Sequence, residues 1–199
     1  MSATVLDMSM SLDGFIAGPN VRPDNGLGDG GQHLHDWALK HSLDHKDVGA
    51  GIRGVNKQAI GEVMQTGAVI AGRRTFEPAG GWNGDHHDGV PIYILSRHEA
   101  PGWAARWPLV HYMSDLAEIV RRAKAAAGDR NVLVHGSGLA QRALAADLLD
   151  ELEIHVVPLL FGDGIRLFDN LGVTQYRLER TRVLEGEEGV THLHYRVRR

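Results

Sequence analysis

One stretch of the chain, residues 131–160, places the strongest constraint on the fold. Its opening residues, 131–134, are apolar and match a short buried strand, and residues 153–160 match a second one. Between them, residues 139–146 have the apolar spacing of a helix. A strand, a helix and a second strand in that order are typical of a parallel sheet covered by helices. The stretch therefore predicts an α/β fold.

The turn between the first of these strands and the helix is rich in glycine. It reads His135, Gly136, Ser137, Gly138 and Leu139. Glycines let a backbone approach a ligand closely, and the first N–H groups of a helix have no partner within it, so this turn could bind a phosphate. Gln141 stands where the third glycine of the dinucleotide fingerprint would be. Ordinary turn chemistry is therefore the alternative interpretation.

The rest of the chain continues the alternation of strands and helices. Further strands are expected at residues 4–10, 67–72, 91–95 and 109–112, and further helices at residues 32–43, 56–66 and 115–127. Residues 15–17 could form a hairpin with the first strand, and the glycine-rich residues 20–31 are expected to form a loop. Two antiparallel strands are expected at residues 176–184 and 190–197. We expect one domain, residues 1–199, with a mainly parallel central sheet, helices on both faces and a C-terminal antiparallel hairpin.

Arginine and hydroxyl side chains follow two of the expected strands. Arg73, Arg74 and Thr75 come directly after residues 67–72, and Ser96 and Arg97 come after residues 91–95. The carboxyl ends of neighbouring parallel strands lie at the same edge of a sheet, which is where ligands bind in open α/β folds. A guanidinium group can bond two phosphate oxygens at once. These strand ends therefore predict an anion site, with a solvated arginine pair on a surface helix as the alternative.

The composition excludes several classes of protein. The 199 residues carry a formal net charge of -4, which disfavours a basic nucleic-acid-binding face. The chain has no cysteine, so disulfides and thiolate chemistry are excluded. Its N-terminus lacks the pattern of a signal peptide, and no apolar run approaches the roughly 20 residues that span a bilayer. We expect a cytoplasmic protein that acts on a small molecule and binds neither nucleic acid nor membrane.

Five short motifs occur in a fixed order along the chain. They are residues 11–18, 71–77, 93–97, 134–138 and 158–164. Together they resemble the dihydrofolate reductase-like superfamily, and most closely the reductase domain of the bifunctional riboflavin deaminase–reductase family. The resemblance implies an NADPH-dependent reductase, a homodimer, and a pteridine- or aminopyrimidine-like substrate. One candidate reaction is the reduction of 5-amino-6-(5-phosphoribosylamino)uracil in riboflavin biosynthesis; the chain has no deaminase zinc motif.

The resemblance also implies where the cofactor binds. The expected cofactor-binding residues are Ala17, Gly18, Gly72, Arg73, Arg74, Thr75, Leu95, Ser96, Arg97, His135, Gly136, Ser137, Gly138 and Leu139. The arginine-ended strands would hold the adenosine 2′-phosphate, the glycine turn would hold the pyrophosphate, and Ala17 and Gly18 would border the nicotinamide. A basic cluster of this kind favours NADPH over NADH, because only NADPH carries the additional phosphate.

Asp36 is the expected catalytic residue. It stands beside Trp37, at about the place where classical dihydrofolate reductases carry an acidic residue that meets the pterin. The segment before it, residues 19–36, is longer and richer in glycine than the family pattern. The alternative interpretation of Asp36 is therefore a solvated or capping carboxylate.

Three other functions are alternatives to a reductase. A non-catalytic NADP(H)-binding or regulatory protein would keep the cofactor pocket without the chemistry, and a purely structural dimerisation module would bind no cofactor. The twelve histidines include three close pairs that could bind a metal, namely His33 with His35, His86 with His87, and His192 with His194. None has a known zinc spacing, so we expect no metal.

Overall fold

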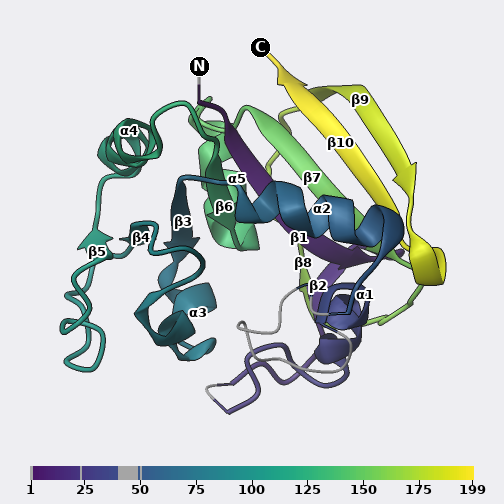
Figure 1. The fold of residues 1–199 in the computed structure, drawn as a ribbon, viewed down its shortest axis with the longest axis horizontal. Coiled ribbons are helices and arrows are strands. Elements are labelled where there is room, and N and C mark those ends of the chain that lie inside the picture. Colours follow the sequence, from purple (N-terminus) through teal and green to yellow (C-terminus); the bar gives the residue numbers. More distant parts are fainter. Residues whose placement is uncertain (1, 23, 40–48, 50) are drawn as a thin grey trace.

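A single eight-stranded sheet forms the centre of the computed structural model, which describes residues 2–22, 24–39, 49 and 51–199 (Figure 1). The strand order is β5-β4-β3-β6-β1-β7-β10-β9. The strands are β1 (Thr4–Ser11), β3 (Ala68–Gly72), β4 (Ile92–Leu95), β5 (Val110–Met113), β6 (Val132–His135), β7 (Glu151–Val157), β9 (Arg177–Glu185) and β10 (Thr191–Arg198). The strands from β5 to β7 run parallel, whereas β10 is antiparallel to both β7 and β9. The predicted parallel sheet with a C-terminal antiparallel hairpin is confirmed.

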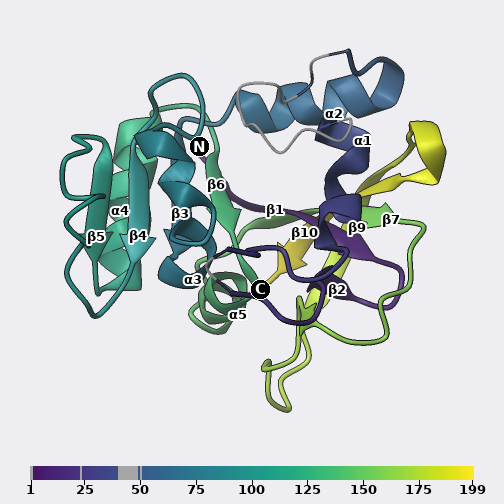
Figure 2. The same ribbon diagram turned by 90° about the horizontal axis from the view of Figure 1, so that it is seen from below.

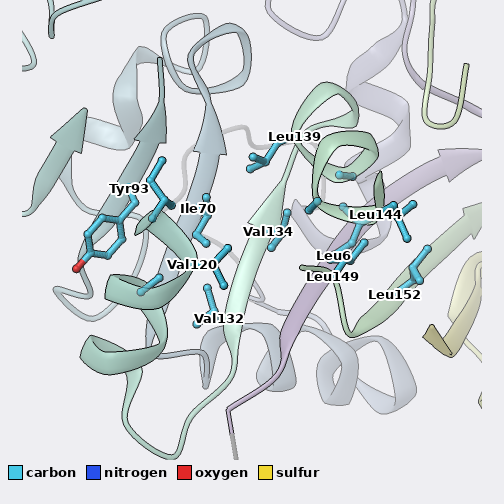
Figure 3. Close-up of a cluster of buried hydrophobic side chains, with 14 of the residues drawn as sticks. Leu6, Ile70, Tyr93, Val120, Val132, Val134, Leu139, Leu144, Leu149 and Leu152 are labelled. Carbon is cyan, nitrogen blue, oxygen red and sulfur yellow. The ribbon is translucent and has the colours of Figure 1, made fainter. Parts of the chain in front are cut away.

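Helices pack against both faces of the sheet. The helices α4 (Leu116–Ala127) and α5 (Ser137–Ala145) cover one face, where their apolar side chains meet those of the central strands (Figure 3). The helix α2 (Gly54–Met64), the short α1 (Asp36–Leu39) and the 3-10 turn η1 (Gly31–His35) cover the other. Figure 2 shows α2 and α5 on opposite sides of the sheet. No helix in the described part of the chain is both long and apolar enough to cross a bilayer.

The helix predicted at residues 32–43 differs from the structure. Residues 31–39 form η1 followed by α1, and residues 40–43 lie outside the described part of the chain. The other predicted helices agree within a few residues, and the Asp115 carboxylate caps α4 by accepting hydrogen bonds from the N–H groups of Ala117 and Glu118. The predicted strand 153–160 ends earlier, at Val157, where Pro158 offers no N–H group to continue the ladder.

Residues 15–17 do not form a hairpin with β1, contrary to the prediction. They form β2 (Phe15–Ala17), which pairs antiparallel with β8 (Ile165–Arg166) in a separate two-stranded sheet. The cause is Asp13, whose carboxylate accepts hydrogen bonds from the N–H groups of Phe161 and Gly162 and draws the turn toward that segment. The Ser11 hydroxyl and these N–H groups lower the pKa of Asp13 to about 2.

The N-terminus of α2 is capped by a residue from the distant β9–β10 turn. The side chain of the N-cap residue itself, Arg53, forms no capping hydrogen bond. Instead, Glu187 of η4 (Glu187–Gly189) accepts hydrogen bonds from the N–H groups of Val55 at 3.1 Å and Asn56 at 3.0 Å. The backbone N–H of Asn56 contributes most to lowering the pKa of Glu187. The helix dipole also favours a negative charge at the N-terminus of a helix.

We expect Glu187→Gln to lower the melting temperature at neutral pH, because the variant loses the charge-assisted cap. The folded-state pKa of Glu187 is lowered, so its stabilising effect is present above the usual glutamate pKa and disappears as the pH falls. The difference in melting temperature between wild type and variant should therefore shrink below about pH 4. Thermal unfolding across this range checks the prediction, with Glu188→Gln as the control. A difference that does not depend on pH would contradict it.

Candidate functional site

Three neighbouring strands end side by side at one edge of the sheet. The parallel register pairs Gly72 of β3 with Leu95 of β4, and Ala71 of β3 with His135 of β6. The chain leaves β3 into the short helix α3 (Arg73–Phe76) and leaves β6 into α5. The structure thus brings three groups of predicted site residues to adjacent strand ends: Gly72 to Thr75, Leu95 to Arg97, and His135 to Leu139.

Glycine is required at one position of the turn and leaves open space at another. Gly136 has a φ of 95°, and a Cβ atom there would lie 2.3 Å from the Thr75 hydroxyl oxygen. Gly136 therefore lies directly against Thr75 of α3, with no room for a side chain. At Gly138, in the first turn of α5, and at Gly72, an added Cβ would meet no atom within 4 Å. The N-cap of α5 also makes no side-chain capping bond, so no N-cap side chain occupies the first N–H groups of this helix.

The arginines of the two neighbouring strand ends are accessible. The Arg73 side chain is 42% exposed, with Nη1 at 3.4 Å from Oε2 of Glu77 one turn later in the chain. Arg74 and Arg97 are exposed. The Ser96 hydroxyl accepts a hydrogen bond from the N–H of His98 and donates one to its carbonyl, so Ser96 shapes the turn that carries Arg97. These guanidinium groups can reach a phosphate from solvent.

Ala17 and Gly18 are buried beyond the end of β1. The N–H of Gly18 donates to the Leu27 carbonyl at 2.9 Å, and a Cβ at Gly18 would lie 2.0 Å from the Asp29 carbonyl oxygen. A Cβ at Gly164 would likewise lie 2.1 Å from the Ala17 carbonyl oxygen. Three segments thus meet at this point with no room for side chains. Because β1 is the neighbour of β6, this point belongs to the same edge of the sheet as the glycine turn.

Asp36 and Trp37 are adjacent in sequence but face different surroundings. The Asp36 carboxylate lies 2.9 Å from Nδ1 of His33, and its side chain is partly buried. The Trp37 indole points inward and is 6% exposed, and its N–H donates to the Ser9 hydroxyl at 2.9 Å. Asp36 therefore lies on a different element from the three strand ends, and its predicted role stays a prediction.

A chain of three histidines leads away from the glycine turn. Nε2 of His135 lies 3.1 Å from Nε2 of His86, and Nδ1 of His86 lies 2.7 Å from Nδ1 of His87. His87 ends the chain by donating from Nε2 to the Thr66 carbonyl oxygen at 3.1 Å. His86 also packs edge-on against Trp82, at 4.7 Å between ring centroids. His86 and His87, one of the close histidine pairs of the sequence, thus link the glycine turn to the interior, which no sequence pattern indicated.

The sheet face beneath α1 and α2 carries a second polar network. Its members are Asp7 and Ser9 on β1, Glu153 and His155 on β7, and His192 and His194 on β10. All but His194 are buried. Polar residues two apart in otherwise apolar strands were a visible signal of this layer, because such residues share one face. His192 and His194 contact different partners, His155 and Glu153 respectively, and the absence of a metal stays a prediction.

A cavity of about 460 Å³ lies between the C-terminal half of α2 and this same sheet face. Asp7, Glu62, Thr66, Arg130, Glu153 and His194 are among its lining residues. Arg182 of β9 is bonded to the Glu62 carboxylate inside it, which lowers the pKa of Glu62. The cavity adjoins the amino-terminal halves of the strands, whereas the glycine turn and the arginines lie at their carboxyl ends.

Comparison with known proteins identifies the family. A model of the RibD C-terminal domain matches residues 3–192. The chain belongs to the RibD C-terminal domain family. A riboflavin biosynthesis protein from Shewanella sp. PV-4 has a similar structure, with a TM-score of 0.67, 21% identity and 99% of each chain covered. A search of curated protein sequences with this chain found no match.

Two further solved structures share the fold. Acinetobacter baumannii RibD is 15% identical with a TM-score of 0.62; the match covers all of this chain and 59% of the RibD chain. Dihydrofolate reductase from Enterococcus faecalis, complexed with NADP(H) and RAB-propyl, is 14% identical with a TM-score of 0.58, over 99% of this chain and 97% of that chain. The predicted dihydrofolate reductase-like fold is confirmed by these similarities.

Proposed function

We propose that this protein is an NADPH-dependent reductase that transfers a hydride to a pteridine- or aminopyrimidine-like small molecule. The observation that carries the proposal is the meeting of three strand ends, which places Arg97, Arg73 and the Gly136 turn at one edge of the sheet. Membership of the RibD C-terminal domain family supports a reductase. The candidate reaction is the reduction of 5-amino-6-(5-phosphoribosylamino)uracil.

The residues at this edge fit such a cofactor. The open corner at Gly138 leaves room for a pyrophosphate against the first N–H groups of α5. Arg73, Arg74 and Arg97 would bind the 2′-phosphate, and the closely packed Ala17 and Gly18 would border the nicotinamide. When bound, NADPH supplies the hydride; the protein orients the ring and provides a proton for the acceptor.

We expect Asp36→Asn to lower turnover about 100-fold while NADPH affinity changes less than about twofold. The Asp36 carboxyl group, in its protonated form, is the expected proton donor on α1, whereas the cofactor would be held mainly at the strand ends. Steady-state NADPH oxidation and calorimetric binding check the two quantities separately. Asp24→Asn, an exposed carboxylate paired with Arg22, is the control. Full activity of Asp36→Asn would leave Asp36 without a catalytic role.

A non-catalytic NADP(H)-binding protein is the alternative, and the position of Asp36 favours it. The Asp36 carboxylate is engaged by His33, and lies on an element separate from the strand ends. A panel of pteridines and aminopyrimidine ribose phosphates separates the two functions. Steady oxidation of NADPH with one member supports the reductase, whereas tight NADPH binding without turnover across the whole panel supports the alternative.

A further inference from the structure

Four buried side chains form a continuous hydrogen-bonded chain beneath α1 and α2. Nε2 of His155 lies 2.9 Å from the Asp7 carboxylate, and Nδ1 of His155 lies 2.7 Å from Nδ1 of His192. Nε2 of His192 lies 3.0 Å from Oδ1 of Asn56. His155 and His192 are 1% and 0% exposed, so water does not replace any of these contacts.

The bonding pattern fixes how many protons the two imidazole rings carry. The Asn56 amide donates from Nδ2 to the Glu187 carbonyl, so its oxygen faces His192 and accepts a proton from Nε2 of that ring. At the other end, the Asp7 carboxylate accepts from Nε2 of His155. The contact between the two Nδ1 atoms requires one further proton. Three protons on two rings leave the pair with one positive charge.

The charge belongs on His155 rather than on His192. Burial alone would lower the pKa of His155, but the Asp7 carboxylate outweighs burial and raises that pKa above its usual 6.5. Burial and the neighbouring charge of His155 lower the pKa of His192 to about 4. The other charged or titratable groups facing the pair are Glu153 on β7, His194 on β10, Glu62 on α2 and Glu187 on η4. The three glutamate carboxylates add to the attraction for a proton, whereas His194 opposes it at His192.

The Trp37 indole packs directly on this charged pair. Its ring centroid lies 4.4 Å from that of His155 and 5.0 Å from that of His192. Together with the bond to Ser9, these contacts fix the indole on several sides. Trp37 belongs to α1, which continues η1. At the start of η1, a Cβ on Gly31 would lie 3.3 Å from the Gly18 nitrogen.

We propose that His155 is a positioning residue that acts only while protonated. Its imidazolium, held between Asp7 and His192, fixes Trp37 and thereby keeps α1 and η1 against the Ala17–Gly18 segment. Loss of the proton breaks the contact between the two rings or the bond to Asp7, and α1 loses its support. The effect on catalysis rests on the proposed function, because that function places the nicotinamide beside Gly18; the protonation state does not depend on it.

Nitrogen NMR of the imidazole rings tests the protonation directly. We expect both His155 nitrogens to carry protons at a pH above 6.5, where an ordinary histidine is mostly neutral. In Asp7→Asn the countercharge is lost, and His155 should become neutral at that pH. Trp37 emission, assigned by difference from Trp37→Phe, should change as wild-type His155 loses its proton. If His155 is already mostly neutral at pH 6.5, the ordinary histidine pKa, the proposal is overturned.

Kinetics test the positioning role. We expect His155→Gln to lower kcat about tenfold to 100-fold with NADPH affinity changed less than about twofold, since a small misplacement affects chemistry more than phosphate binding. In wild type, kcat should also fall at alkaline pH as His155 deprotonates. The pH profile of the variant should lack this alkaline decrease. His111→Gln, on the edge strand β5, is the control. Unchanged kcat in His155→Gln would overturn the positioning role.

Two results separate this proposal from the proposed function. If wild type reduces no acceptor, the proposed function fails, while the NMR and emission measurements still decide whether a protonated His155 holds Trp37. If His155→Gln does not fold, Asp7→Asn and the wild-type pH series provide the same comparison. A melting temperature that falls as the pH rises through the His155 pKa agrees with the proposal. A group whose pKa is raised in the folded state stabilises that state only at pH values below this raised pKa.

Discussion

Replacing Arg73 and Arg97 together by alanine should weaken NADPH binding about 100-fold and NADH binding less than about threefold. Each charge-assisted bond to a phosphate is worth about 1.5–3 kcal/mol, and partial exposure of both arginines places the expected loss toward the lower end. NADH lacks the 2′-phosphate that these guanidinium groups would contact. Calorimetric dissociation constants for both cofactors, measured at fixed salt concentration, give the two ratios.

A matched double variant controls for the loss of two positive charges. Arg177 and Arg180 are exposed on β9, several strands away from β3 and β4 in the sheet order. Arg177→Ala with Arg180→Ala should leave both dissociation constants within about twofold of wild type. Equal losses of NADPH and NADH in the Arg73 and Arg97 variant would show that these arginines do not contact the 2′-phosphate.

Gly138→Val should weaken the binding of both NADPH and NADH about 100-fold while the protein stays folded. A Cβ at Gly138 meets no protein atom within 4 Å, and valine is a better helix residue than glycine, so the folded state can accept it. The new side chain would stand where the pyrophosphate approaches the N–H groups of α5, and the lost bonds account for the expected decrease. Melting temperature and calorimetric binding of the same sample check both parts.

Two other glycines show whether the effect is specific. Gly102→Val, at an exposed glycine that also has open space, should change neither binding nor melting temperature. Gly136→Val should lower the melting temperature as well as binding, since Gly136 has a φ of 95° and its Cβ would meet Thr75 at 2.3 Å. Unchanged cofactor affinity in Gly138→Val would place the pyrophosphate elsewhere.

The sequence could predict the edge of the sheet because each part of it is local. Apolar runs marked β3, β4 and β6, and Arg73, Arg97 and Gly136 follow those runs directly, so a parallel sheet brought them together. The cap on α4 was equally local, since Asp115 and its two N–H partners lie within four residues.

The features that could not be predicted depend on contacts between distant residues. Asp13 bonds to the N–H groups of Phe161 and Gly162, nearly 150 residues away, and so turns β2 out of the expected hairpin. The bonds from His86 to His135 and from His155 to His192 likewise depend on strand order and register. Residue type alone gives neither of these, because a register shift of one residue moves a side chain to the other face.

Asp36 and Trp37 show the limit of reasoning from adjacency. They are neighbours in sequence, yet Asp36 pairs with the exposed His33 while Trp37 packs on the buried His155. Successive residues of a helix point in directions about 100° apart, so adjacent side chains can have different surroundings. No sequence pattern indicates that His155 lies beneath the Trp37 indole.

A crystal structure of the protein with NADPH bound tests the central claim most directly. We predict that the pyrophosphate lies within hydrogen-bond distance of the N–H groups at Gly136 to Leu139, and that the 2′-phosphate contacts Arg73 or Arg97. A cofactor bound away from the ends of β3, β4 and β6, or a 2′-phosphate remote from both arginines, would contradict the account.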